Sequence, residues 1–212
     1  EPSGESLDFQ FYDYETDTVY DISETYEFIA DMVYGSVVTP EILNITLDVD
    51  IIAPMSIGWN WMSMNVYTDN MSLNSVLLSL DDNAEYIKAQ AGYADYYPGY
   101  GWFGNLSDID NTSMYKLRML AADNIVLTGE TVDVATTVLD LPSGWNWVGY
   151  TPQITLDLNT ALLNIPDGNA SYLKSQAGYA DYYAGFGWFG NLEEMSPFEG
   201  FQLQLNEATS FV

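Results

Sequence analysis

Apolar and polar side chains alternate in five stretches of the chain, which is the pattern of a strand with one buried face. Three of these stretches lie near the start of the sequence, at 7–11, 26–30 and 43–49. The other two are at 115–119 and 201–205. All five predict half-buried strands in antiparallel sheets.

Two further stretches have apolar residues at helical spacing, each after a residue suited to begin a helix, Ser72 or Asp157. The apolar positions are Leu73, Val76, Leu77 and Leu80 in the first stretch and Leu158, Ala161, Leu162 and Ile165 in the second. Two turns of helix are not stable alone, so we expect both helices to pack on a sheet.

A hairpin is expected after each short helix. Residues 86–97 are rich in strand-forming side chains, Pro98-Gly99 breaks the strand, and 101–106 returns as the second arm. Ala184-Gly185 is the corresponding break in the second half of the chain.

The chain contains two copies of one module. Residues 88–106 and 174–192 are identical at 16 of 19 positions, and the motif Gly-Trp-Asn-Trp occurs at 58–61 and again at 144–147. Both pairs are 86 residues apart, so we infer a duplication.

The predicted fold class is mainly β, with antiparallel, sandwich-like sheets in two tandem repeats that each carry one short helix. We define module 1 as residues 51–120 and module 2 as residues 143–212. An N-terminal β segment, which could be the end of a preceding β domain, occupies 1–50, and connecting strands are expected at 121–142.

The layout of each module resembles that of GWN-type surface modules. It consists of GWNW, a short helix, the motif KxQxGYAxYY, then GWFGNL and a final strand. Tandem modules of this type occur in large exported proteins of bacteria, archaea and some algae. The resemblance covers nearly the whole chain. It implies an extracellular or cell-surface location and an adhesive, structural or binding role, and it brings no catalytic residues.

Charge and composition narrow the possible functions. Four Lys and Arg residues face 31 Asp and Glu residues, which gives a net charge of −27 that repels nucleic acid and anionic membranes. No apolar run is long enough for membrane insertion. The absence of Cys and His excludes thiol and Ser-His-Asp catalysis and the usual zinc sites. We therefore expect no enzyme, although the paired carboxylates Asp95 and Asp181 leave glycoside hydrolysis open.

Aromatic residues of the hairpins are the candidate ligand-binding residues, because exposed rings beside carboxylates can stack on sugars. Lys88 and Lys174 join them, since they hold equivalent positions. An ion pair with a nearby acid such as Asp95 or Asp181 is the favoured role of these lysines, and ligand contact is the other. The tryptophans are expected mainly as core anchors. The candidates are Tyr93, Tyr96, Tyr97, Tyr100, Tyr179, Tyr182, Tyr183, Phe186, Lys88 and Lys174.

Two other kinds of site are suggested by short motifs. Asp108, Asp110, Asn111 and Ser113 offer oxygen donors at close spacing that suit Ca²⁺, the one candidate cofactor, although turn chemistry also explains them. Sequons for N-glycosylation, as in exported glycoproteins, occur at Asn44, Asn70, Asn105, Asn111 and Asn169.

The function expected from the sequence is that of a non-catalytic, extracellular interaction or structural protein with an adhesive role. One alternative is a carbohydrate-binding module that uses the Tyr-rich hairpins. Another is a subunit of an extracellular fibre, sheath or layer. The partner is accordingly a glycan or a protein at a cell surface, or other copies of the chain.

Overall fold

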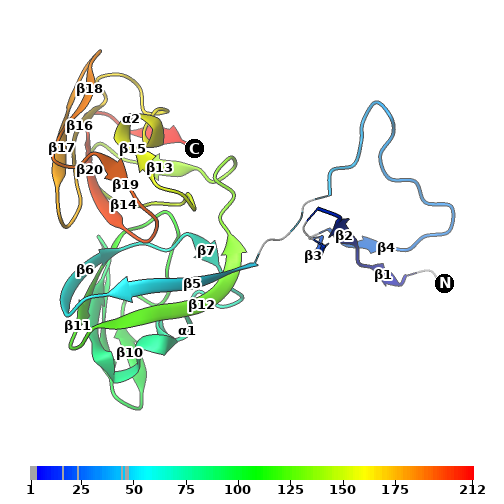
Figure 1. The fold of residues 1–212 in the computed structure, drawn as a ribbon, viewed down its shortest axis with the longest axis horizontal. Coiled ribbons are helices and arrows are strands. Elements are labelled where there is room, and N and C mark those ends of the chain that lie inside the picture. The colour runs from blue at the N-terminus through cyan, green and yellow to red at the C-terminus, as the bar shows by residue number, and fades with distance from the viewer. Residues whose placement is uncertain (1–3, 16, 23, 44, 46–47) are drawn as a thin grey trace. The chain divides into compact units, whose positions relative to one another are not determined.

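The computed structural model describes residues 4–212 except 16, 23, 44, 46 and 47. The chain forms two compact units, Glu1–Asp48 and Val49–Val212, and the second unit contains both modules (Figure 1). Antiparallel strands dominate and the helices are short, which confirms the predicted mainly-β fold class.

The described residues of the N-terminal unit form two small strand pairs. β1 (Ser6–Leu7) pairs with β4 (Tyr26–Glu27), and β2 (Gln10–Asp13) pairs with β3 (Thr18–Asp21). The strand expected at 26–30 is therefore only two residues long.

The expected strand at 43–49 falls partly on Asn44, Thr46 and Leu47, which lie outside the described residues. Its last two residues begin β5 (Asp48–Met55). Ile45 forms a single bridge to Ile22.

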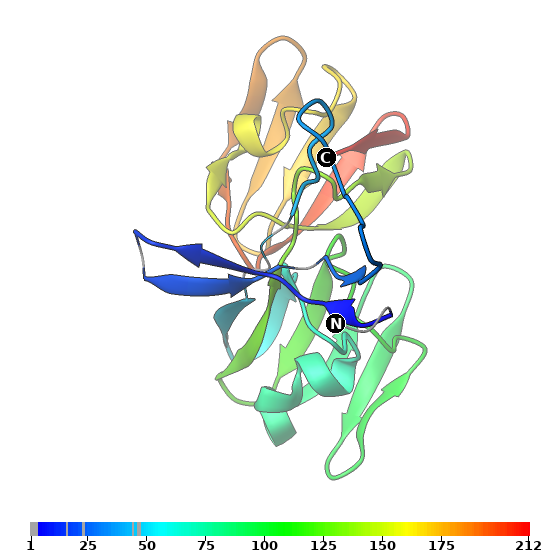
Figure 2. The same ribbon diagram turned by 90° about the vertical axis from the view of Figure 1, so that its right-hand side faces the viewer.

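Each module is built on one five-stranded antiparallel sheet, and the two sheets have the same strand pairing (Figures 1 and 2). In module 1 the order is β10-β9-β8-β11-β6, and in module 2 the matching strands give β18-β17-β16-β20-β14. The bounds in module 1 are β6 (Gly58–Met62), β8 (Ala84–Lys88), β9 (Tyr93–Tyr97), β10 (Gly101–Gly104) and β11 (Tyr115–Met119). The bounds in module 2 are β14 (Gly144–Gly149), β16 (Ala170–Lys174), β17 (Tyr179–Tyr183), β18 (Gly187–Gly190) and β20 (Gly200–Leu205).

The inner face of each sheet is covered by the short helices and by a second group of strands. In module 1 these elements are α1 (Leu73–Val76), the 3-10 helix η1 (Leu78–Asn83) and the sheet β5-β12-β7, with β7 at Val66–Tyr67 and β12 at Asp123–Thr131. In module 2 they are α2 (Leu158–Ala161) and the pairs β13–β21 and β15–β19, with β13 at Leu139–Leu141, β15 at Leu156–Asp157, β19 at Glu194–Met195 and β21 at Thr209–Phe211.

The predicted apolar positions of the helices and of the last strand form the core. Leu73, Leu80 and Leu117 are almost completely buried in module 1, as are Leu158 and Leu203 in module 2. Burial of one such leucine contributes roughly 1.5–3 kcal/mol. The helices therefore exist because their apolar sides pack on the sheet, as their short length requires.

Two expectations are corrected by the structure. Residues 86–97 are not one strand, because the chain turns sharply between β8 and β9, where Ala89 N donates to Gly92 O at 2.8 Å. Residues 121–142 do more than connect the modules, because β12 packs on module 1 and β13 pairs with the last strand of module 2.

The modules are joined by main-chain hydrogen bonds that cross between them in both directions. Directly after β6, Ser63 N donates to Phe198 O, just before β20, at 3.0 Å. β14 ends with Gly149 N donating to Thr112 O at 2.7 Å, just before β11. Each edge strand is thus continued by a segment of the other module, and the two modules form one unit.

Candidate functional site

The outer face of module 1, opposite the helices, carries two rows of aromatic and charged side chains that run across the sheet. The pairing register places the members of each row side by side. The first row is Trp59, Arg118, Tyr86, Asp95 and Phe103, and the second is Trp61, Lys116, Lys88 and Tyr93. We call this surface the outer face of module 1.

Module 2 repeats both rows with few changes, and we call the surface that they form the outer face of module 2. The first row is Trp145, Gln204, Tyr172, Asp181 and Phe189, and the second is Trp147, Gln202, Lys174 and Tyr179. Gln202 and Gln204 replace Lys116 and Arg118, so the outer face of module 2 carries fewer positive charges.

Within each outer face the aromatic rings contact one another, and these contacts are the same in both modules. Tyr86 stacks on Tyr93 with ring centroids 6.0 Å apart, and Trp59 meets Tyr86 edge-on. Tyr172 and Tyr179 stack at 5.8 Å in module 2. These contacts hold the rings in fixed positions while leaving part of each exposed.

The candidate tyrosines divide between the two faces of the sheets. Tyr93, Tyr97, Tyr179 and Tyr183 lie on the outer faces and are about half exposed. Tyr96 and Tyr182 point to the inner side instead, because each pairs with a buried tryptophan, Trp102 or Trp188. Tyr100 and Phe186 are the most exposed of the set, and they lie in the turns after β9 and β17.

The six tryptophans differ in burial, which corrects the expectation that they are mainly core anchors. Trp102 and Trp188 are buried and belong to the two cores. Trp59 and Trp145 are each 43% exposed on the outer faces. The third pair, Trp61 and Trp147, is half-buried where the modules meet.

Reciprocal side-chain contacts hold the two edge strands β6 and β14. Gln90, in the turn after β8, accepts from Trp147 N at 2.7 Å and donates to Trp145 O at 2.8 Å. Gln176, its counterpart in module 2, accepts from Trp61 N at 2.7 Å and donates to Trp59 O at 2.6 Å. The motif KxQxG of each module thus recognises the GWNW strand of the other.

Three lysines and two tryptophans gather at this contact, and we call them the lysine junction: Lys88, Lys116, Lys174, Trp61 and Trp147. Lys116 Nζ lies 3.8 Å from the ring centroid of Trp61 and 4.6 Å from that of Trp147. Lys88 reaches Trp147 of the other module at 5.5 Å. Lys174 reaches Trp61 of the other module at 5.9 Å and lies nearer, at 5.0 Å, to Trp145 of its own module. The cations thus lie over indole faces, which attract positive charge.

The predicted ion pairs of Lys88 and Lys174 are not formed. In the part of the chain that the structure describes, the one ion pair joins the fourth cation, Arg118, to Glu85 at 2.7 Å. Partial burial lowers the pKa of Lys116, and the neighbouring charges of Lys88 and Lys174 lower it further. The junction is therefore a positively charged spot in a strongly acidic chain.

The acidic loop considered for Ca²⁺ has a structural explanation. The Asp110 carboxylate accepts hydrogen bonds from Thr112 N at 2.7 Å and Thr112 Oγ1 at 2.6 Å. Asn111 is buried and donates to Met64 O and Val66 O. Ser113 bridges to Val148, and the Asp108 carboxylate accepts from the neighbouring serine hydroxyl. Among the described residues, no group of three or more carboxylates is placed to hold a metal ion. Ca²⁺ binding stays a prediction.

The sequons are placed differently in the fold. Asn70 and Asn105 are exposed, and Asn169 is half-buried. The Asn111 amide is committed to the core hydrogen bonds described above, which leaves no room for a glycan in the folded chain. Asn44 lies outside the described residues.

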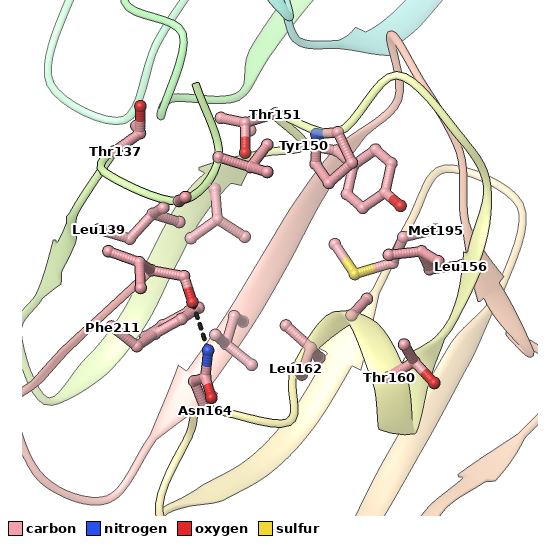
Figure 3. Close-up of a pocket in the computed structure, with 18 residues that line it drawn as sticks. Thr137, Leu139, Tyr150, Thr151, Leu156, Thr160, Leu162, Asn164, Met195 and Phe211 are labelled. Carbon is pink, nitrogen blue, oxygen red and sulfur yellow. Dashed lines mark hydrogen bonds between the residues drawn. The ribbon is translucent and has the colours of Figure 1, made fainter. Parts of the chain in front are cut away.

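Module 2 also contains an apolar cavity of about 320 Å³ between α2, β14 and β21, with Tyr150, Leu162 and Phe211 in its wall (Figure 3). By the repeat offset, Phe211 corresponds to Ile125 of β12. In module 1, β12 continues past Ile125 to pair with Val66 of β7, and the corresponding Pro152 lines the cavity. The pairing of β12 with β7 has no counterpart in module 2, and we assign no small-molecule ligand to the cavity.

Sequence reasoning missed the tryptophans of the outer faces, the two glutamines and Lys116. Lys116 has no basic counterpart in module 2, so the repeat did not single it out. Among the described residues, no helix has the length and apolar character needed to cross a membrane. Comparison with protein-family models, curated proteins and solved structures found no match to the chain.

Proposed function

We propose that the chain is a non-catalytic carbohydrate-binding protein of the cell surface, in which the outer face of each module stacks on sugar rings. The observation that carries this proposal is the exposure of equivalent aromatic side chains on both outer faces. Trp59 and Trp145 are each 43% exposed, and Phe103 and Phe189 are each 55% exposed.

Physical chemistry favours a sugar as the ligand of such a surface. Tyr and Trp rings present an apolar face with a polar tip, which suits the apolar face of a sugar and its hydroxyl groups. Carboxylates lie beside the rings, since Asp95 is between Tyr86 and Phe103 in the first row. The outer faces therefore offer both stacking surfaces and hydrogen-bond acceptors.

The duplication adds to the binding strength. A polysaccharide repeats its own unit, so two equivalent faces on one compact unit can engage two parts of the same chain. The second contact is then intramolecular, and the avidity exceeds the affinity of either face alone. This argument also explains why the exposed rings are the same in both modules.

A second candidate function is assembly of copies into a fibre, sheath or layer. The exposed aromatic positions favour it as well, because contiguous exposed apolar surface is typical of protein interfaces. Sedimentation velocity distinguishes the two: a carbohydrate-binding protein stays monomeric without ligand, whereas an assembling subunit grows with concentration.

The direct test is affinity electrophoresis against a panel of neutral polysaccharides. We expect one or more of them to retard the wild-type chain, and the double variant Tyr97→Ala/Tyr183→Ala to lose most of the retardation. Leu78→Ala/Leu163→Ala is the matched control, because these leucines are exposed but lie away from the outer faces. Migration of the wild type unchanged by every polysaccharide would overturn the proposal.

A further inference from the structure

The lysine junction concentrates positive charge where the rest of the molecule is negative. It holds three of the four basic residues of a chain with 31 acidic ones. In so acidic a chain, a basic side chain is expected to lie beside a carboxylate. Arg118 does so, whereas the described part of the chain provides no ion pair for Lys88, Lys116 or Lys174.

The arrangement brings like charges together. Lys116 and Lys88 are directly opposite each other on neighbouring strands β11 and β8, and Lys174 approaches the same indole ring as Lys116 from the other module. Like charges directly opposite each other destabilise a sheet. The indole faces of Trp61 and Trp147 offset part of this repulsion, and an anion bound among the three ammonium groups would offset more of it.

The surroundings of the junction define what kind of anion it suits. In the second row of each outer face, the lysine is followed by a neutral aromatic residue, Tyr93 after Lys88 and Tyr179 after Lys174. A ligand that reaches the junction would therefore meet positive charge at one point and uncharged rings beside it. Beyond these rings the acidic surface repels long polyanions.

We propose that Lys88, Lys116 and Lys174 form an anion-binding site that takes a carboxylate or sulfate group carried by an otherwise neutral glycan. This inference rests on the proposed carbohydrate-binding function and names the class of its ligand. The site belongs to both modules, because Lys116 lies between one tryptophan of each. The site should bind a sparsely charged glycan more tightly than a uniformly charged one.

The test uses pullulan, hydroxyethyl cellulose and galactomannan, each as the neutral polymer, with a carboxylate on about one sugar in ten, and with a sulfate at the same density. A fully carboxylated form of each polymer is the fourth arm. We expect the sparsely charged forms to bind the wild-type chain at least about fivefold more tightly than the neutral form, with the fully charged form gaining less. The comparison of carboxylate with sulfate shows which anion the site prefers.

Lys116→Gln is the diagnostic variant, because the equivalent position of module 2 is already Gln202. We expect it to lose the gain for charged polymers and to keep the affinity for the neutral ones. Asn124→Asp is the matched control, because it also lowers the net charge by one. Asn124 is exposed and lies on β12, which covers the inner face of the five-stranded sheet of module 1. It should keep the gain. If Lys116→Gln does not fold, Lys88→Gln and Lys174→Gln replace it.

The outcomes separate the two claims. Binding of neutral polymers without any gain for the charged ones overturns the anion site and leaves the proposed function standing. The same holds if Lys116→Gln keeps the full gain, because the lysines then serve only to join the modules. Absence of binding to every neutral polymer overturns both, whether or not the charged forms bind.

Discussion

Gln90 and Gln176 are equivalent residues of the two modules, and each uses its side-chain amide to hold the edge strand of the other module. Each amide replaces the two main-chain partners that a neighbouring strand would provide, one donor and one acceptor. An edge strand with unpaired main-chain groups invites pairing with another chain. The two glutamines thus protect the edge strands β6 and β14 and connect the modules by the same pair of hydrogen bonds.

Removal of either glutamine should weaken the contact between the modules. We expect Gln90→Ala and Gln176→Ala each to lower the free energy of unfolding by about 1–2 kcal/mol, since a main-chain donor and acceptor lose their partners. Urea unfolding followed by tryptophan fluorescence measures the change. Gln10→Ala is the control, because Gln10 bonds to Asp21 within the N-terminal unit. Equal stability of all three variants would contradict this role.

The beginnings of the two short helices should differ in their sensitivity to substitution. Asp157 accepts hydrogen bonds from Asn159 N and Thr160 N, whereas Ser72 makes no side-chain cap hydrogen bond. We expect Asp157→Ala to lower Tm by about 2–4 °C, the effect of losing one cap in a chain of this size. Ser72→Ala is the matched control and should change Tm by less than half as much.

The Asp157 cap should also depend on pH. The hydrogen bond from the Thr160 hydroxyl is the main cause that lowers the pKa of Asp157 below its usual value of 3.8. Its stabilising effect is therefore present above that value and is lost as the pH falls through the lower pKa of the folded state. The difference in Tm between wild type and Asp157→Ala should shrink in acid, and a constant difference down to pH 2 would contradict the cap.

Stability at alkaline pH should depend on Tyr115. Burial raises the pKa of Tyr115 from 10.0 to about 12, so the folded chain binds more protons than the unfolded chain between these values. Stability contributed by this group is complete below pH 10 and falls as the pH rises towards 12, by roughly 2–3 kcal/mol in total.

The variant Tyr115→Phe tests this pH dependence, because Phe201 already occupies the equivalent position. Urea unfolding at pH 8 and pH 11 should show a smaller loss of stability between the two pH values than in wild type. The lowered pKa of Lys116 makes stability rise with pH, which is the opposite direction, but this contribution is present in both wild type and Tyr115→Phe. The same loss in both proteins would mean that Tyr115 does not titrate with a raised pKa.

Local sequence pattern predicted the strands and helices that form the two cores. Alternation in 115–119 and helical spacing at Leu73 and Leu158 each give a buried side that the structure confirms. The repeat predicted that the two modules share one fold. It did not reveal the turn at 89–92, because strand-forming residues flank it on both sides.

The lysine junction could not be predicted from local pattern. Trp61 and Gln176 are 115 residues apart in the chain, and periodicity carries no information on contacts at that separation. The sequence showed that Lys88 and Lys174 are equivalent, but the structure was needed to show that each reaches a tryptophan of the other module, Lys88 at Trp147 and Lys174 at Trp61. The three pairs of equivalent tryptophans also differ in burial. Local sequence does not predict this difference, because tertiary packing decides it.

The exposure of the outer-face rings is the claim on which the proposed function depends, and ¹⁹F NMR of the chain labelled with 5-fluorotryptophan tests it most directly. The six tryptophans provide six signals that single substitutions assign. On addition of oligosaccharides from the polysaccharide that retards the chain most, the signals of Trp59 and Trp145 should shift, while those of the buried Trp102 and Trp188 stay in place. Shifts confined to Trp102 and Trp188, or no shift at any signal, would contradict carbohydrate binding on the outer faces.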